Sequence, residues 1–160
     1  MYYINNFFIY SILGHIIETF VYIFHKGESG ILYGRWTPIY GIGVILILLV
    51  YKYFETKKIS KIKKNIYIFL ASSILLTIVE YVGGVLIEKI FGYSFWTYEG
   101  LPLNIGKYIS IEMAIVWGIC SLIFIKFLKP LSDRLIKKIP SFITWILIVI
   151  FIIDLIITII

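Results

Sequence analysis

Residues 43–70, GVILILLVYKYFETKKISKIKKNIYIFL, place a lysine-rich segment between two apolar runs. The lysines cluster between residues 52 and 64, and apolar residues dominate on both sides. Two apolar runs joined by a short basic connection are typical of two membrane-spanning helices with a cytoplasmic loop, because Lys and Arg accumulate in such loops. The stretch therefore predicts an integral membrane protein and also indicates its orientation.

The composition of the whole chain agrees with a membrane protein. The chain has 160 residues, of which 61% are hydrophobic, and its mean hydropathy is +0.98. Soluble domains are about half apolar or less. At ~20 residues per span, five helices use most of this length and leave only short loops. We expect one integral membrane domain over residues 1–160, in contact with the lipid bilayer.

Hydropathy predicts five spans, and each of them should be a helix. An open strand cannot satisfy its backbone hydrogen bonds in lipid, so the expected fold is an all-α bundle of five transmembrane helices. The spans are predicted near residues 5–25, 38–54, 66–88, 108–128 and 141–160.

The basic residues predict the orientation of these spans. Of the 15 Lys and Arg residues, eleven lie in the second and fourth loops and four in the first and third loops. The positive-inside rule then predicts a cytoplasmic N-terminus, an outer C-terminus and a multi-pass protein of the cell membrane. The net charge of +6 is explained by this asymmetry, and we expect no nucleic-acid partner. The four residues of the outer loops are Lys26, Arg35, Lys89 and Lys107.

Two smaller features leave alternatives open. The basic run KKISKIKK either fixes the topology or also binds anionic lipid headgroups, at about 1 kcal/mol for each basic residue near the surface. The single cysteine, Cys120, excludes an internal disulfide and a cysteine metal cluster, and it is expected to be a small buried apolar residue.

Acidic residues inside predicted spans are the main candidates for a functional site. A charged group near the bilayer centre costs at least ~2.5 kcal/mol, so such residues usually face the bundle interior or a partner. Five acids lie within or at the edge of the spans, and the predicted topology places all of them in the outer half of the membrane. These acids are Glu18, Glu80, Glu88, Glu112 and Asp154.

Helical spacing groups polar residues on one face of two spans. The first span carries Ser11, His15, Glu18, Tyr22 and His25 at steps of three or four residues. The third span carries Ser73, Thr77, Glu80, Gly84 and Glu88 in the same way. Two such faces predict an outward-open polar pocket. The alternative is purely structural pairing, with Glu18 and Glu80 bonded to Arg35 and Lys107. A metal site at His15 is not favoured, since the HExxH pattern is absent.

The two outer loops, residues 26–38 and 89–108, are predicted to cap this pocket. Both loops contain a Trp-Thr pair, at residues 36–37 and 96–97, and both reach the next span through Pro and Gly. The aromatic residues suit the membrane interface. Arg35 can form two parallel hydrogen bonds to a carboxylate or a phosphate. Glu18, Glu80 or Glu112 is its expected partner within the chain, and a lipid headgroup is its expected partner outside it.

Several motifs resemble one family of small bacterial membrane proteins. The segments YSILGHIIE, GILYGRWTPIYGIG, EYVGGVLIEKIFG and FWTYEGLPLNIGKYISIE resemble the ABC-transporter type IV, CmpB-like family, from Tyr10 to about Pro140. His15 and Arg35 depart from the family pattern, which has Trp and Pro there. The resemblance implies a transporter-related membrane protein. The positions that match the family pattern best are Glu18, Pro38, Tyr40, Gly41, Glu80, Glu88, Trp96, Pro102 and Asn104.

Three functions remain open from the sequence. The first is a permease-like or substrate-binding membrane subunit, which would work as a homo-oligomer or with other membrane subunits. The second is a non-catalytic accessory protein, and the third is an outward-facing lipid-modifying enzyme with Glu18 or Glu80 as general base. The chain has no GxxxxGK[ST] motif, so any ATPase would be a separate subunit. No cofactor, metal or recognisable catalytic motif is expected. The candidate pocket residues are His15, Glu18, Arg35, Tyr40, Glu80, Glu88, Trp96, Asn104 and Glu112.

Overall fold

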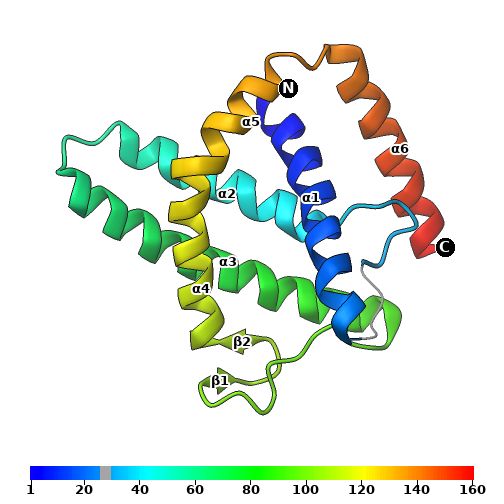
Figure 1. Cartoon of the computed structure of the whole chain (residues 1–160). Coiled ribbons are helices and arrows are strands. Elements are labelled where there is room, and N and C mark those ends of the chain that lie inside the picture. The colour runs from blue at the N-terminus through cyan, green and yellow to red at the C-terminus, as the bar shows by residue number, and fades with distance from the viewer. Residues whose placement is uncertain (26–29) are drawn as a thin grey trace. The chain divides into compact units, whose positions relative to one another are not determined.

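The computed structural model describes residues 1–25 and 30–160, and the side chains of residues 21–25 lie outside this description. Predictions that involve Lys26, the beginning of the loop 26–38, and the side chains of Tyr22 and His25 therefore fall outside the described residues. The predicted all-α class is confirmed (Figure 1). The helices are α1 (Tyr2–His25), α2 (Pro38–Glu55), α3 (Lys61–Phe91), α4 (Ile111–Ile123), the π-helical η1 (Phe124–Leu128), α5 (Lys129–Ile136) and α6 (Ser141–Ile159).

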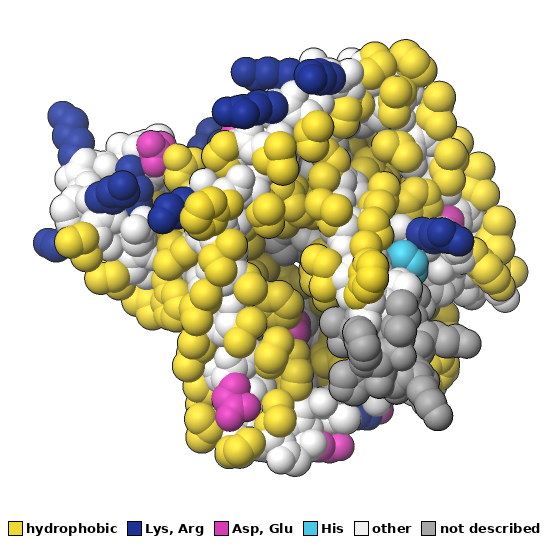
Figure 2. Space-filling model, viewed as in Figure 1, with side chains coloured by type: hydrophobic (Ala, Val, Ile, Leu, Met, Phe, Trp, Pro, Cys, Tyr) yellow, Lys and Arg dark blue, Asp and Glu magenta, His cyan; other side chains and the backbone are white. Residues whose placement is uncertain are grey.

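Among the described residues, four stretches of helix are long and apolar enough to cross a membrane. They are Pro38–Glu55, Lys61–Phe91, Ile111–Ile136 and Ser141–Ile159. Apolar side chains cover most of the visible helix surfaces, as expected for helices that face lipid (Figure 2). The chain is thus a multi-pass membrane protein by the length and composition of its helices. The remaining predicted span, near residues 5–25, corresponds to α1, and both its membrane crossing and the orientation of the termini stay predictions.

The helix ends differ from the predicted loop boundaries in the basic segment. The Ser60 hydroxyl accepts a hydrogen bond from the Lys63 backbone N–H and caps α3, so Lys61, Lys63 and Lys64 belong to this helix and not to a loop. Lys64 forms an ion pair with Glu55 at 3.0 Å across the turn between α2 and α3. At its other end α3 stops at Gly92, which adopts a φ of 79°.

The chain divides into two compact units, and unit 1 comprises Met1–Ile45 and Leu131–Ile160. Its helices pack closely where glycines lie: a side chain at Gly41 would collide with Phe7 and Ser11, and one at Gly14 would collide with Tyr40. These glycines allow α1 and α2 to approach each other closely. The Thr144 hydroxyl on α6 donates a 2.6 Å hydrogen bond to Asn5 Oδ1 on α1.

Unit 2, Leu46–Pro130, is built around the contact between α3 and α4. A side chain at Gly118 of α4 would collide with Ser73 and Phe69 of α3, and one at Gly84 of α3 would collide with Tyr108. In the segment of the chain that connects α3 to α4, a short hairpin pairs β1 (Asn104–Ile105) with β2 (Ile109–Ser110) in antiparallel register. The hairpin was not expected, and α4 begins after it at Ile111, three residues later than the predicted start of the span near residue 108.

Candidate functional site

Within unit 1, hydrogen bonds connect the loop that precedes α2 to α6. The backbone N–H of Gly34 and the indole N–H of Trp36 both donate to Asp154 Oδ2, at 3.0 and 2.5 Å. Trp36 and Asp154 are only 7% and 8% exposed. Phe8 and Phe151 surround the Trp36 ring, with ring centroids 6.3 and 5.6 Å away. A carboxylate in an apolar helix is therefore satisfied by two N–H donors and held inside an aromatic cluster.

The same loop is also bonded to α1. The Thr37 hydroxyl donates a 3.2 Å hydrogen bond to Glu18 Oε2, and the Tyr40 hydroxyl is hydrogen-bonded to the same carboxyl group. The backbone N–H of Thr37 donates to the Ser11 carbonyl at 2.9 Å. Two of the predicted pocket residues, Glu18 and Tyr40, are thus brought together, and the donors come from α2 and the residue before it.

His15 and Arg35 both lie in unit 1. The His15 ring is next to Gly30, whose φ of +79° favours glycine and where a Cβ would lie 3.3 Å from His15 Nδ1. That nitrogen is buried and has no hydrogen-bond partner among the described residues. Arg35 is exposed between the two residues that bind Asp154, and among the described residues it forms no ion pair with Glu18.

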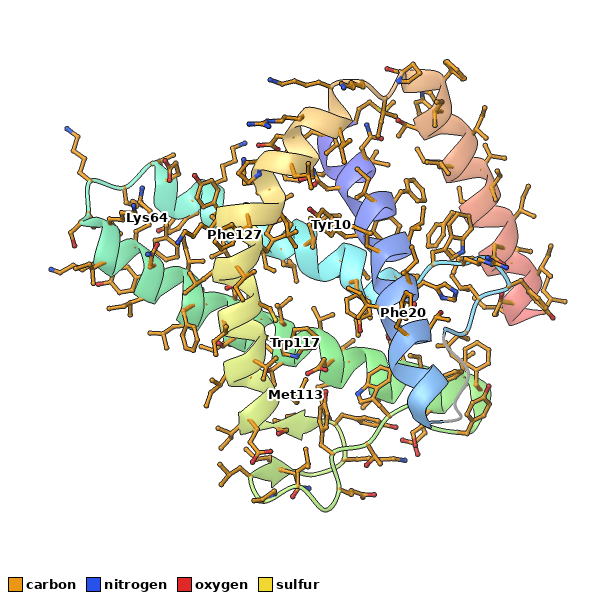
Figure 3. The ribbon with its side chains drawn as sticks, viewed as in Figure 1. Tyr10, Phe20, Lys64, Met113, Trp117 and Phe127 are labelled. Carbon is orange, nitrogen blue, oxygen red and sulfur yellow. The ribbon has the colours of Figure 1, made fainter. Side chains whose placement is uncertain are left out.

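In unit 2, Glu80 is the most deeply buried of the predicted pocket residues. It is 7% exposed, and each of its carboxylate oxygens accepts a hydrogen bond. Tyr98 of the loop donates to Oε1 at 2.5 Å, and the indole N–H of Trp117 on α4 donates to Oε2 at 2.7 Å. Figure 3 shows Trp117 between α4 and α3. Glu80 therefore joins α3, α4 and the loop at one point.

Glu88, two helical turns further along α3, has a different environment. Lys107 forms an ion pair with one carboxylate oxygen and Tyr108 donates a 2.7 Å hydrogen bond to the other. The Glu88 carboxylate raises the pKa of the Lys107 ammonium by accepting its hydrogen bond. The two side chains are 30% and 41% exposed, so solvent screens this pair. Lys107 thus pairs with Glu88, whereas the sequence had suggested Glu80 as its partner.

The remaining predicted residues of unit 2 lie in or beside the hairpin. The Trp96 ring packs edge-on against Tyr108 with centroids 6.0 Å apart, and its indole N–H is buried with no partner among the described residues. The Asn104 side chain donates to the Gly106 carbonyl at 2.9 Å and so closes the turn of the hairpin. Glu112 lies in the first turn of α4, where a negative charge is favourable. Asn104 and Glu112 thus have local contacts within unit 2, and the part of all three residues in a pocket stays a prediction.

The predicted pocket residues therefore form two groups, one in each unit. Unit 1 contains His15, Glu18, Arg35 and Tyr40, and unit 2 contains Glu80, Glu88, Trp96, Asn104 and Glu112. The list of candidate pocket residues left out four residues that complete these groups, although Asp154 was named among the five acids of the predicted spans and is the only charged residue of the last one. The four residues are Asp154, Trp36, Tyr98 and Trp117.

The described residues contain no group of three or more His, Cys, Asp or Glu side chains that could hold a metal ion. The donors around the carboxylates are instead hydroxyl and N–H groups of neutral side chains, with Lys107 as the exception. Such an arrangement can fasten loops to helices, and it can also present buried carboxylates to a cationic or polar ligand.

Comparison with known proteins gives one family. The sequence model of the family described as "Putative ABC-transporter type IV" matches residues 5–159. No curated protein and no solved structure matches the chain.

Proposed function

Because the chain belongs to the ABC-transporter type IV family that matches residues 5–159, we propose that it is a permease-like or substrate-binding subunit of a transport system in the cell membrane. In this proposal the polar pocket opens to the outside, and the loops 26–38 and 89–108 cover it. The family match supports a membrane protein related to ABC transport. The role of a permease and the position of the pocket are our proposals.

The environment of Glu80 is the observation that carries this proposal. Its carboxylate is buried in a helix long and apolar enough to cross a membrane, and its two donors, Tyr98 and Trp117, are neutral. Glu88 on the same helix is paired with the cation of Lys107 instead. A buried carboxyl group whose donors among the described residues are neutral is suited to contact a cationic or polar ligand.

The hydrogen bonds of the outer loops support their proposed role as a lid. Tyr98 connects the loop 89–108 to Glu80, and Thr37 connects the end of the loop 26–38 to Glu18. A ligand that takes over either carboxylate competes with the loop hydroxyl that now occupies it. Binding and loop release would then be coupled through the same oxygen atoms.

A complete transport system would need further chains. Four or five helices of one small chain enclose little space, so we propose that copies of this chain or other membrane subunits complete the pathway. The absence of a P-loop motif assigns ATP hydrolysis, where the system uses it, to a separate subunit.

The experiment compares cells that have or lack the chain. Mass spectrometry of the spent medium identifies compounds whose depletion requires the wild-type chain, and cells that express Glu18→Gln or Glu80→Gln are then measured in the same way. We expect both variants to reach the membrane at wild-type levels and to lose the depletion. Glu55→Gln, which changes an exposed acid paired with Lys64 in the basic turn, is the control and should retain it.

Two results contradict the proposal. If no compound depends on the chain, it is not a transport subunit under those conditions of growth. If Glu18→Gln and Glu80→Gln both lower the amount of protein in the membrane on an immunoblot, the acids act as structural links. This second result favours an accessory protein, a function consistent with the fact that both carboxylates already have donors within the chain.

A further inference from the structure

An apolar groove lies between α1, α2 and α6 in unit 1. Its volume is about 320 Å³, within the range of ~300–1,000 Å³ that is usual for small-molecule sites in proteins. Its walls are aromatic and aliphatic side chains, so the groove suits a hydrocarbon chain better than a polar solute. The residues that line it include Tyr3, Ile4 and Phe7 of α1, Ile45 of α2, and Ile148 and Phe151 of α6.

Contacts at two levels hold the walls of the groove together. The Phe151 ring of α6 packs edge-on against Phe7 and Phe8 of α1, with ring centroids 5.3 and 5.8 Å away. Nearer the beginning of both helices, the Thr144 hydroxyl donates a hydrogen bond to Asn5. The groove is therefore formed by helices that contact each other directly, and it does not depend on the loops of the candidate site.

The groove extends along α6 from the end of the helix that adjoins α5. The Tyr2 hydroxyl donates a 2.7 Å hydrogen bond to Asp133 of α5, so the first turn of α1 also lies at this end. Tyrosine side chains are common at the level of the lipid headgroups. Ile148 and Phe151 lie about 10 and 15 Å beyond Ser141, the first residue of α6, at a rise of about 1.5 Å per residue. The groove thus reaches from the expected headgroup level toward the middle of a helix that is long and apolar enough to cross a membrane.

Positive charges gather at the same end of unit 1. Arg134, Lys137 and Lys138 are exposed at the end of α5 and in its connection to α6, and Figure 2 shows Lys and Arg side chains over this region. None of the three takes part in the two ion pairs found among the described residues. Asp133 is the only acid of the segment 131–140, which leaves this segment with a net charge of +2. An anion at this end would therefore be attracted.

We propose that the groove binds one acyl chain of an anionic phospholipid and that Arg134, Lys137 and Lys138 bind its phosphate. A phospholipid joins a charged headgroup to a hydrocarbon chain, and unit 1 places cations at one end of an apolar groove in the same order. Basic residues near the membrane surface attract anionic headgroups, and the Arg guanidinium can form two parallel hydrogen bonds to a phosphate. This lipid site is separate from the acids of the candidate pocket and does not rest on the transport proposal.

A second copy of the chain fits the groove less well than a lipid does. Two copies related by a two-fold axis along the membrane normal would present the same groove to each other. Their α5–α6 connections would then lie at the same membrane surface, where two segments of net charge +2 repel each other. An anionic lipid, by contrast, neutralises part of this charge.

Photolabelling of the wild-type chain tests the position of the lipid. The purified full chain is placed in phosphatidylcholine nanodiscs that contain a small fraction of phosphatidylglycerol with a diazirine on one acyl chain, and adducts are located by mass spectrometry of peptides. We expect several-fold more adducts on Phe7, Ile148 and Phe151 than on Ile146 and Ile150, two exposed residues of α6 outside the groove. Excess unlabelled phosphatidylglycerol should remove these adducts, and the same excess of phosphatidylcholine should not.

Thermal unfolding tests the part played by the charges. A ligand that binds only the folded state raises the Tm, by about 3–6 °C at ten times its Kd for a chain of this size. We expect this rise in detergent with phosphatidylglycerol relative to an equal amount of phosphatidylcholine. The double variant Lys137→Gln/Lys138→Gln should lose the rise. Lys57→Gln/Lys58→Gln removes two exposed lysines from the turn between α2 and α3 and is the matched control, which should keep it.

A further pair of variants tests the groove itself. Ile148→Trp places a large side chain in the groove and should abolish both the adducts and the rise in Tm. Ile146→Trp makes the same change at an exposed position outside the groove and should preserve both. If Ile148→Trp does not fold, the labelling pattern of the wild-type chain still decides the position of the lipid.

Four results overturn the proposal. The first is an even distribution of adducts over the exposed residues of α6, and the second is an equal rise in Tm with both lipids. The third is an equal loss of the rise in the two double-lysine variants, which would indicate a general attraction to basic residues. The fourth is a disulfide-linked dimer of Ile148→Cys in a Cys120→Ala background without lipid adducts in the groove, which would show that a second copy occupies it.

Discussion

The indole nitrogen of Trp36 donates a 2.5 Å hydrogen bond to Asp154, a residue 118 positions later in the sequence. This bond and the one from the Gly34 backbone join the loop before α2 to α6 within unit 1. The two bonds also explain why an acid occurs in α6, a helix that is long and apolar enough to cross a membrane.

Trp36→Phe should destabilise unit 1, because it keeps most of the aromatic packing but removes one donor from a buried carboxylate. Hydrogen bonds to charged groups contribute about 1.5–3 kcal/mol. We expect a lower Tm in detergent, measured by intrinsic fluorescence or by a thiol-reactive dye. Trp145→Phe is the control, since Trp145 is 58% exposed, and it should change the Tm little. Equal shifts in both variants would argue against a role for the Asp154 bond.

Asp154→Leu should release the loop, because neither Gly34 nor Trp36 would retain its acceptor. Arg35 lies between these two residues and is exposed, so trypsin should cleave after Arg35 faster in this variant than in the wild type. Asp154→Asn retains an acceptor oxygen and should be cleaved at an intermediate rate. Cleavage is followed by mass spectrometry of the fragments. Unchanged cleavage in Asp154→Leu would mean that other contacts fix the loop.

Gly118→Ala should weaken the contact between α3 and α4, because the added methyl group would collide with Ser73 and Phe69. Overpacking of this kind costs about 1–3 kcal/mol. The measurement is the Tm of the purified chain in detergent. Ile119→Val, at an exposed neighbouring position, is the control. A wild-type Tm for Gly118→Ala would show that the helices can separate slightly without cost.

The predicted orientation can be tested with introduced cysteines, because the single native cysteine of the chain, Cys120, can be replaced first. In a Cys120→Ala background, Arg35→Cys should react with a membrane-impermeant maleimide in intact cells, because the loop 26–38 is predicted to lie outside. Lys58→Cys should react only after the cells are permeabilised. The opposite pattern of labelling would show that the predicted topology is wrong and that the proposed pocket faces the cytoplasm.

The sequence was sufficient for the helical class and for the family, because both depend on long patterns. Runs of apolar residues and motifs spread over most of the chain predict these features without knowledge of individual contacts. The β1–β2 hairpin was missed because strands of two residues are too short to show an alternating pattern. The start of the third span was predicted too late in the sequence, because hydropathy does not detect the cap that Ser60 provides for α3 in a basic segment.

Pairings within the candidate site were harder to predict than its members. Helical spacing placed Glu80 and Glu88 on one face of the third span, but it could not decide which of them Lys107 reaches. The contact of Asp154 with Trp36 joins distant parts of the sequence, so no local pattern predicts it. The charge of Arg35 made it the expected partner of an acid. The donors to Asp154 are instead the uncharged N–H groups of its two neighbours, Gly34 and Trp36.

The bond between Trp36 and Asp154 has a consequence for the order in which the protein forms during synthesis. Unit 2 is one continuous segment, but unit 1 needs residues 131–160. At 5–20 residues per second, about 6–24 s separate the synthesis of Trp36 from that of Asp154. During this interval Gly34 and Trp36 lack their acceptor, so water, lipid or the insertion machinery must satisfy them. Unit 2 can therefore fold first, and the emergence of α6 completes unit 1.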